Sequence, residues 1–152
     1  MKKIQFKKDI EASAQKVYET TLGLIDIKTY EGWTAEFNPT STYEGTWEKG
    51  TKMCFVGTDK NGKRGGMVSE IVEHIPAQFV SIRHYGMIDG DKEITEGPDV
   101  EQWAGSLENY SFHEQNGITT VTIEMDTAEG FDDYFNNTWP KALNKLKELA
   151  EN

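Results

Sequence analysis

The chain has 152 residues and a formal net charge of −10, from 16 Lys and Arg against 26 Asp and Glu. This length predicts a single domain over residues 1–152, and the negative charge argues against nucleic acid or an anionic membrane surface as a partner. Cys54 is the only cysteine, so no disulfide can form within the chain. The sequence has no signal-peptide pattern and no run of about 18 apolar residues. We therefore expect a cytoplasmic protein that does not insert into membranes.

The first quarter of the chain predicts one strand followed by two short helices. Apolar and polar residues alternate over residues 2–10, which indicates a half-buried strand. Ser13 stands at an N-cap position, and helical spacing predicts a helix that ends at Gly23. Residues 24–30 predict a second short helix. The aromatic segment 33–39 that follows fits no regular element.

The middle of the chain alternates between strand-like runs and turns. The predicted strands cover residues 41–47, 52–58, 66–73 and 79–87. Short turns between consecutive strands predict an antiparallel meander. Residues 91–102 predict a polar surface loop, because Pro98 and several acidic residues give this segment little reason to pack.

A tight β-hairpin is predicted around Asn116-Gly117, because a two-residue type I′ loop needs positive φ at both positions. If Gln115 and Ile118 close the loop, one face of the hairpin is mostly apolar and the other polar. The pairs on the apolar face are Phe112 with Val121, Tyr110 with Ile123, and Glu108 with Met125. The sequence therefore places a carboxylate, Glu108, on the inward face.

The last segment, residues 131–150, predicts a long helix that faces the core. Its apolar stripe consists of Phe131, Phe135, Trp139, Ala142, Leu146 and either Leu149 or Ala150. Pro140 lies inside this pattern, and an interior proline removes a backbone hydrogen bond. We expect either a kink near Asn136 and Asn137 or a short first turn that ends before Trp139.

Several short motifs, in their order along the chain, support a family resemblance. They are Val17-Tyr18-Glu19-Thr20, Trp33-Thr34 with Phe37-Asn38-Pro39, Gly45-Thr46-Trp47 with Gly50, Ile71-Val72-Glu73-His74-Ile75-Pro76, and Gly117-Ile118-Thr119-Thr120. With these motifs the chain resembles the START-like (SRPBCC) helix-grip superfamily, and within it the domain of activators of the ninety-kilodalton heat-shock-protein ATPase. The resemblance implies an α+β fold in which a curved antiparallel sheet of about six to seven strands wraps around a long C-terminal helix. The activities in this superfamily are too varied to assign a function.

A helix laid across a concave sheet cannot fill it completely, so we expect a cavity between them. If Val80 pairs with Phe112 and Ile82 with Tyr110, then His84 lies beside Glu108, where each side chain favours the charged form of the other. The pair then anchors the polar end of a ligand, acts as an acid and a base, or is purely structural. A strand shift of one residue would instead turn His84 to solvent.

The candidate ligand-binding residues combine this pair with apolar neighbours. They are His84, Glu108, Tyr110, Met125, Trp33, Phe37, Phe131 and Tyr134. No catalytic residue is assigned, and no metal or cofactor is expected, because histidines and cysteine do not occur at ligand spacing and no phosphate loop or nucleophile motif is present.

Three functional hypotheses follow. The first is non-enzymatic binding of a small, hydrophobic or amphipathic molecule between sheet and helix. The second is a chaperone-activator-like module that binds a protein partner through its surface. The third is a cyclase- or hydratase-like enzyme that uses His84 and Glu108 as acid and base.

Overall fold

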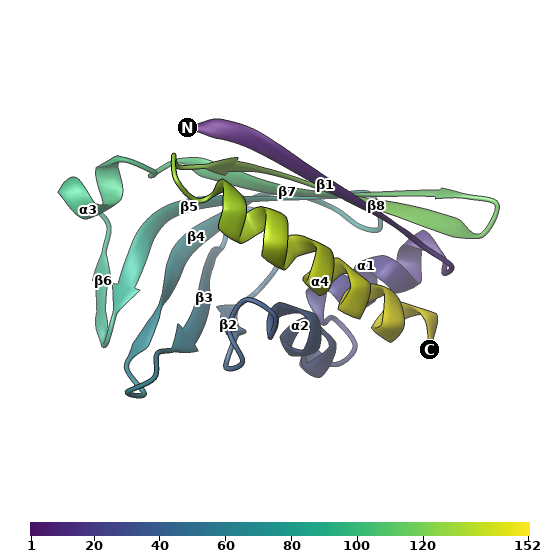
Figure 1. Cartoon of the computed structure of the whole chain (residues 1–152), viewed down its shortest axis with the longest axis horizontal. Helices are drawn as coiled ribbons and strands as arrows, with labels where there is room; N and C mark the ends of the chain where they lie inside the picture. The colour runs from purple at the N-terminus through teal and green to yellow at the C-terminus, as the bar shows by residue number, and fades with distance from the viewer.

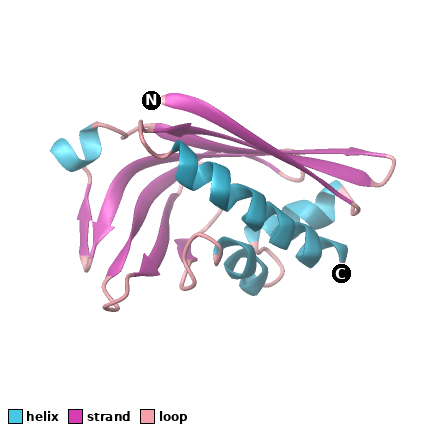
Figure 2. Cartoon of the chain, viewed as in Figure 1, coloured by secondary structure: helices cyan, strands magenta, loops and turns pink.

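The computed structural model describes residues 1–152 and contains eight strands and four helices (Figure 1; Figure 2). The strands are β1 (Lys2–Ile10), β2 (Thr42–Gly45), β3 (Lys52–Thr58), β4 (Arg64–Ile75), β5 (Phe79–Asp89), β6 (Lys92–Ile94), β7 (Ser106–Gln115) and β8 (Ile118–Thr127). The helices are α1 (Ala14–Leu22), α2 (Ile27–Thr34), α3 (Pro98–Glu101) and α4 (Asp132–Glu151).

All the strands belong to one antiparallel sheet. Its order is β1-β8-β7-β5-β4-β3-β2, and β6 pairs with the end of β5. The two outermost strands in that order, β1 and β2, are consecutive in the chain, and α1 and α2 connect them. Figure 1 shows the sheet curving around the long helix α4, with α2 beside that helix. The predicted α+β helix-grip fold is therefore confirmed, with β6 as an additional strand.

The hairpin of β7 and β8 has the predicted register. Tyr110 pairs with Ile123, and Glu108 with Met125. The two loop residues have positive φ, 56° at Asn116 and 80° at Gly117, as a type I′ turn requires. The buried residues of the inward face are Tyr110, Phe112, Val121, Ile123 and Met125, whereas the outward Asn109, Ser111 and Thr122 are half-buried.

Helix α4 covers the core with one face and contacts β1, α1 and α2. Its buried residues are Thr138, Trp139, Ala142, Leu143, Leu146 and Ala150. One detail of the prediction is wrong, because Phe131 precedes the helix and is 53% exposed. Of the two alternatives predicted for Pro140, the early end before Trp139 is also wrong, because the helix continues through the proline. Pro140 and Asn136 are both exposed, so the carbonyl that the proline leaves without a backbone donor can bind water.

The second helix lies further along the chain than predicted, at Ile27–Thr34 rather than residues 24–30. Asp26 is its N-cap, and the carboxylate accepts a hydrogen bond from the backbone N–H of Lys28 at 3.0 Å. The helix therefore includes Trp33, which the sequence left in an irregular segment.

The prediction of a polar loop over residues 91–102 is also wrong. Gly90, with φ of 68°, turns the chain back so that β6 pairs with β5, and α3 follows. Val100 in α3 is completely buried. Pairing and packing against β5 thus outweigh the polar composition of this segment.

The rotation of α4 can be tested by paired alanine substitutions. Leu146 is 0% exposed, whereas the Lys145 side chain is 45% exposed. Leu146→Ala should lower the free energy of unfolding by about 2–5 kcal/mol, because it leaves a cavity. Lys145→Ala should change it by about 0.5 kcal/mol or less. Similar midpoints and slopes for both variants in denaturant titrations would contradict this placement.

Candidate functional site

A cavity of about 690 Å³ lies within the fold, and 17 of its 27 lining residues are hydrophobic. Residues of α1, α2, α4 and the central strands contribute to the wall, together with Asp99 and Trp103 from α3 and the turn after it. Phe131 lines the cavity and is also 53% exposed, so the mouth lies near the start of α4. The volume is within the range of small-molecule sites, about 300–1,000 Å³.

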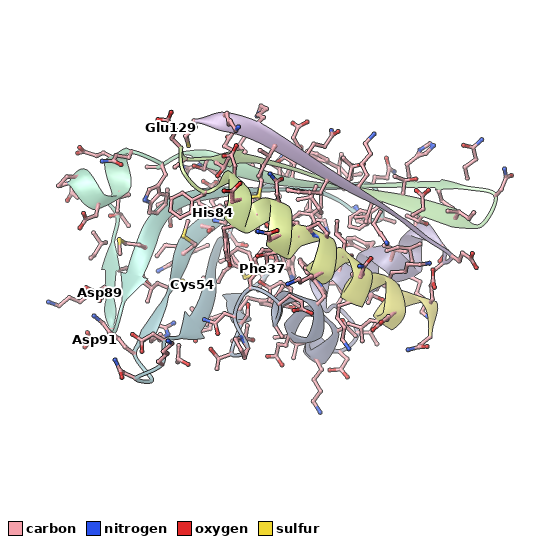
Figure 3. The ribbon with its side chains drawn as sticks, viewed as in Figure 1. Phe37, Cys54, His84, Asp89, Asp91 and Glu129 are labelled. Atoms are coloured by element: carbon pink, nitrogen blue, oxygen red, sulfur yellow. The ribbon has the colours of Figure 1, made fainter.

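Four polar side chains from three adjacent strands form a hydrogen-bonded chain at the cavity wall. Ser69 Oγ on β4 lies 2.6 Å from His84 Nδ1 on β5, and His84 Nε2 lies 3.0 Å from Glu108 Oε1 on β7. The Tyr110 hydroxyl donates to the second oxygen of the same carboxylate, Glu108 Oε2. Figure 3 shows His84 on the central part of the sheet.

The hydrogen-bond partners of His84 indicate which of its ring nitrogens donates. Ser69 is completely buried, and His84 Nδ1 is the only partner of its hydroxyl. If the hydroxyl donates to Nδ1, then Nε2–H donates to Glu108 and every polar hydrogen has an acceptor. A proton on Nδ1 would leave the buried hydroxyl hydrogen of Ser69 without one. In this arrangement, His84 serves Glu108 as a hydrogen-bond donor through Nε2–H.

Two opposing effects set the pKa of Glu108. Burial raises the pKa, but the hydrogen bond from His84, its positive charge whenever it is protonated, and the hydrogen bond from Tyr110 together bring it below the ordinary value of 4.5. Burial and the adjacent Glu108 carboxylate raise the pKa of Tyr110 well above its ordinary value. At neutral pH, Glu108 is therefore an ionised acceptor and Tyr110 a protonated donor.

The predicted contact of His84 with Glu108 is present, but the predicted strand register is wrong by two residues. Val80 pairs with Tyr110, Ile82 with Glu108, and His84 with Ser106. A shift of two residues keeps every side chain on its face. His84 and Glu108 are consequently diagonal neighbours, which long side chains can bridge.

The apolar site residues differ in how directly they meet the cavity. Trp33, Phe37 and Met125 line it, with the Phe37 ring centroid 4.9 Å from that of Trp139 and the Trp139 Nε1 atom 3.3 Å from the Met125 sulfur. Figure 3 shows Phe37 between the α2 region and α4. Tyr134 does not line the cavity and is 46% exposed, although its ring centroid lies 6.4 Å from that of Phe37.

Sequence reasoning missed several residues of the wall. Met67 on β4 and Met87 on β5 are register partners, and both line the cavity. A register shift on β5 leaves Tyr85 without a partner, so Met87 shares the inward face with His84 despite the odd spacing. Trp103 also lines the cavity, and its unusual position after a charged segment was the only signal for it.

No group of three or more His, Cys, Asp or Glu side chains could hold a metal ion. None of the helices is sufficiently long and apolar to cross a membrane.

The sequence matches no protein-family model and no curated protein. Among solved structures, the chain is similar to Aha1 from Colwellia psychrerythraea, solved as a dimer, with 18% identity over 99% of this chain and 97% of that one and a TM-score of 0.68. It is also similar to the AHSA1-like protein from Aeromonas hydrophila, with 16% identity over 99% and 92% of the two chains and a TM-score of 0.70. A protein from Nitrosomonas europaea gives 13% identity, 97% and 93% coverage, and a TM-score of 0.71. The chain therefore has the helix-grip fold of the Aha1-like, START-like proteins, as the sequence resemblance implied.

Proposed function

We propose that this protein is a non-enzymatic binding protein that holds a small, largely apolar molecule in the cavity between the sheet and α4. The observation that supports this proposal is the combination of a 690 Å³ cavity with mostly apolar walls and a carboxylate of fixed geometry, that of Glu108. Sites for small molecules are typically of this kind, with apolar walls for affinity and a few polar atoms for orientation. His84 and Tyr110 hold the carboxylate, and the aromatic wall contacts the rest of the ligand.

An enzymatic role for the pair agrees less well with the electrostatics. A general acid or base is most effective when its pKa lies near the operating pH. Hydrogen bonds instead lower the pKa of Glu108 below its ordinary value. Glu108 is thus suited to accepting hydrogen bonds as a stable anion.

The chaperone-activator-like alternative has one observation in its favour. Leu24 and Ile25, between α1 and α2, are 41% and 80% exposed, and Ile27, the first residue of α2, is 38% exposed. A protein partner, such as a chaperone, could bind these apolar side chains at the surface. Loss of partner binding in Ile25→Ser, with the cavity ligand retained, would support this second function.

Native mass spectrometry of the freshly purified protein tests the binding proposal. The expected result is a non-covalent mass increment that disappears on denaturation. Glu108→Gln keeps the side-chain shape but removes the charge, so occupancy should fall; loss of a charge-assisted hydrogen bond corresponds to about tenfold or more in affinity. Glu124→Gln is the matched control, because it removes one carboxylate from the outward face of the same hairpin. Unchanged occupancy in Glu108→Gln would contradict the anchoring role.

The pH dependence of stability tests whether Glu108 is an anion at neutral pH. Because its pKa is lower in the folded state than the ordinary 4.5, ionised Glu108 stabilises the fold above that pH, and this contribution is lost as the pH falls through the folded-state pKa. The difference in free energy of unfolding between wild type and Glu108→Gln should therefore narrow from about pH 6 to about pH 3. A difference that instead changes between about pH 6 and 8 would indicate a raised pKa and favour the acid–base enzyme.

A further inference from the structure

The charged groups around the cavity are almost all acidic. No lysine or arginine is among the lining residues; the acids are Glu108, Asp99 and Asp126, and His84 is the only basic side chain. Asp126 pairs with Lys3 at 3.1 Å and accepts from the backbone N–H of Leu107, and Asp99 is exposed. Glu108 is therefore the largely buried acid of the cavity wall that has no lysine or arginine partner.

Hydrogen-bond donors in the wall are already used by the protein. All four tryptophans of the chain line the cavity, and every indole N–H has a protein acceptor. The acceptors are Thr21 O for Trp33, Leu22 O for Trp47, Asp99 O for Trp103, and the Met125 sulfur for Trp139. The hydroxyls of Thr21, Thr34 and Ser106 likewise donate to backbone carbonyls. Among the lining side chains, the hydroxyls of Tyr30 and Ser41 are the exceptions.

Acceptor capacity remains at Glu108. Each carboxylate oxygen accepts one hydrogen bond from the protein, from His84 or from Tyr110. An ionised carboxylate offers about four acceptor sites, so positions for further donors are left. The Glu108 side chain keeps 18% of its accessible surface and lines the cavity. A ligand that donates hydrogen bonds matches this site, whereas a ligand carboxylate would meet a like charge.

Aromatic rings line the same cavity as the carboxylate, and one of them, Tyr110, contacts it. Trp33, Tyr110 and Trp139 form a triangle with ring centroids 5.8–6.3 Å apart. The faces of such rings attract cations, tryptophan most strongly, and the attraction increases away from water. The rings and the carboxylate therefore favour the same ligand charge.

We propose that the cavity selects an ammonium-bearing, otherwise apolar molecule, whose cationic group lies against Glu108 and the triangle of Trp33, Tyr110 and Trp139. This inference rests on the proposed binding function and adds the chemical class of the ligand. The cation would donate to the remaining acceptor positions of Glu108, and the apolar body would occupy the remainder of the cavity.

Three matched probes test this selectivity on the wild-type protein: phenylbutylamine, phenylbutanol and phenylbutyrate, which share one apolar body and differ in the charge of the end group. Binding can be followed by tryptophan fluorescence, because every tryptophan lines the cavity, and by calorimetry. The amine should bind about tenfold or more tightly than the alcohol, and the carboxylate most weakly. In Glu108→Gln the preference of amine over alcohol should largely disappear, and in the control Glu124→Gln it should persist.

The possible outcomes separate this inference from the proposed function. If alcohol and carboxylate bind as tightly as the amine, the cavity binds small molecules but the charge selectivity is wrong. Tight binding of the carboxylate would point to the Tyr30 and Ser41 hydroxyls as its donors and would also overturn the inference. If no probe binds and the native protein shows no mass increment, both proposals fail. The affinities of the three probes for the wild-type protein decide the matter alone, so both proposals remain testable even if Glu108→Gln folds poorly.

Discussion

A carboxylate on the inward face of a sheet needs hydrogen-bond donors in place of water, and the need to supply them to Glu108 constrains how the central strands align. An ionised carboxyl group removed from water without partners is strongly destabilising. Glu108 therefore receives hydrogen bonds from His84 on β5 and Tyr110 on β7, and Ser69 on β4 completes the chain through His84 Nδ1. Three adjacent strands must be aligned for these contacts to form. The register shift between Val68 and Ser69 provides this alignment, because it sets Ser69 opposite His84.

Local chemistry explains which parts of the fold could be predicted. The hairpin of β7 and β8 was predicted pair by pair, since the Asn116-Gly117 turn specifies the register and alternation specifies the buried face. Elements that form only through contacts with residues distant in the sequence were not predicted. Strand β6 exists because it pairs with β5, and α3 is held by the burial of Val100. The polar composition of residues 91–102 indicates neither the pairing of β6 nor the burial of Val100.

For the candidate site, too, the sequence predicted local features and missed those that depend on long-range pairing. His84, Glu108 and Tyr110 could be placed on one face because faces depend only on alternation within each strand. The register between β5 and β7 was wrong by two residues, because the chain between them passes through β6 and α3 instead of a tight turn. Ser69 and Met87 were missed, since a bulge changes which residues face inward and has no clear sequence signal here.

The size of the cavity argues that it is more than a packing defect. Protein interiors are packed about as densely as organic crystals, and voids larger than a water molecule are few. A space of about 690 Å³ beside the closely packed rings of Trp33, Phe37 and Trp139, with a mouth near the start of α4, is a pocket rather than a void of this kind. The apolar atoms that line such a pocket lack the contacts that atoms of a packed interior make. A ligand that binds only the folded state would restore those contacts and stabilise the protein in proportion to its concentration over its dissociation constant. On the proposed function, occupancy of the cavity would therefore stabilise the sheet and α4 together.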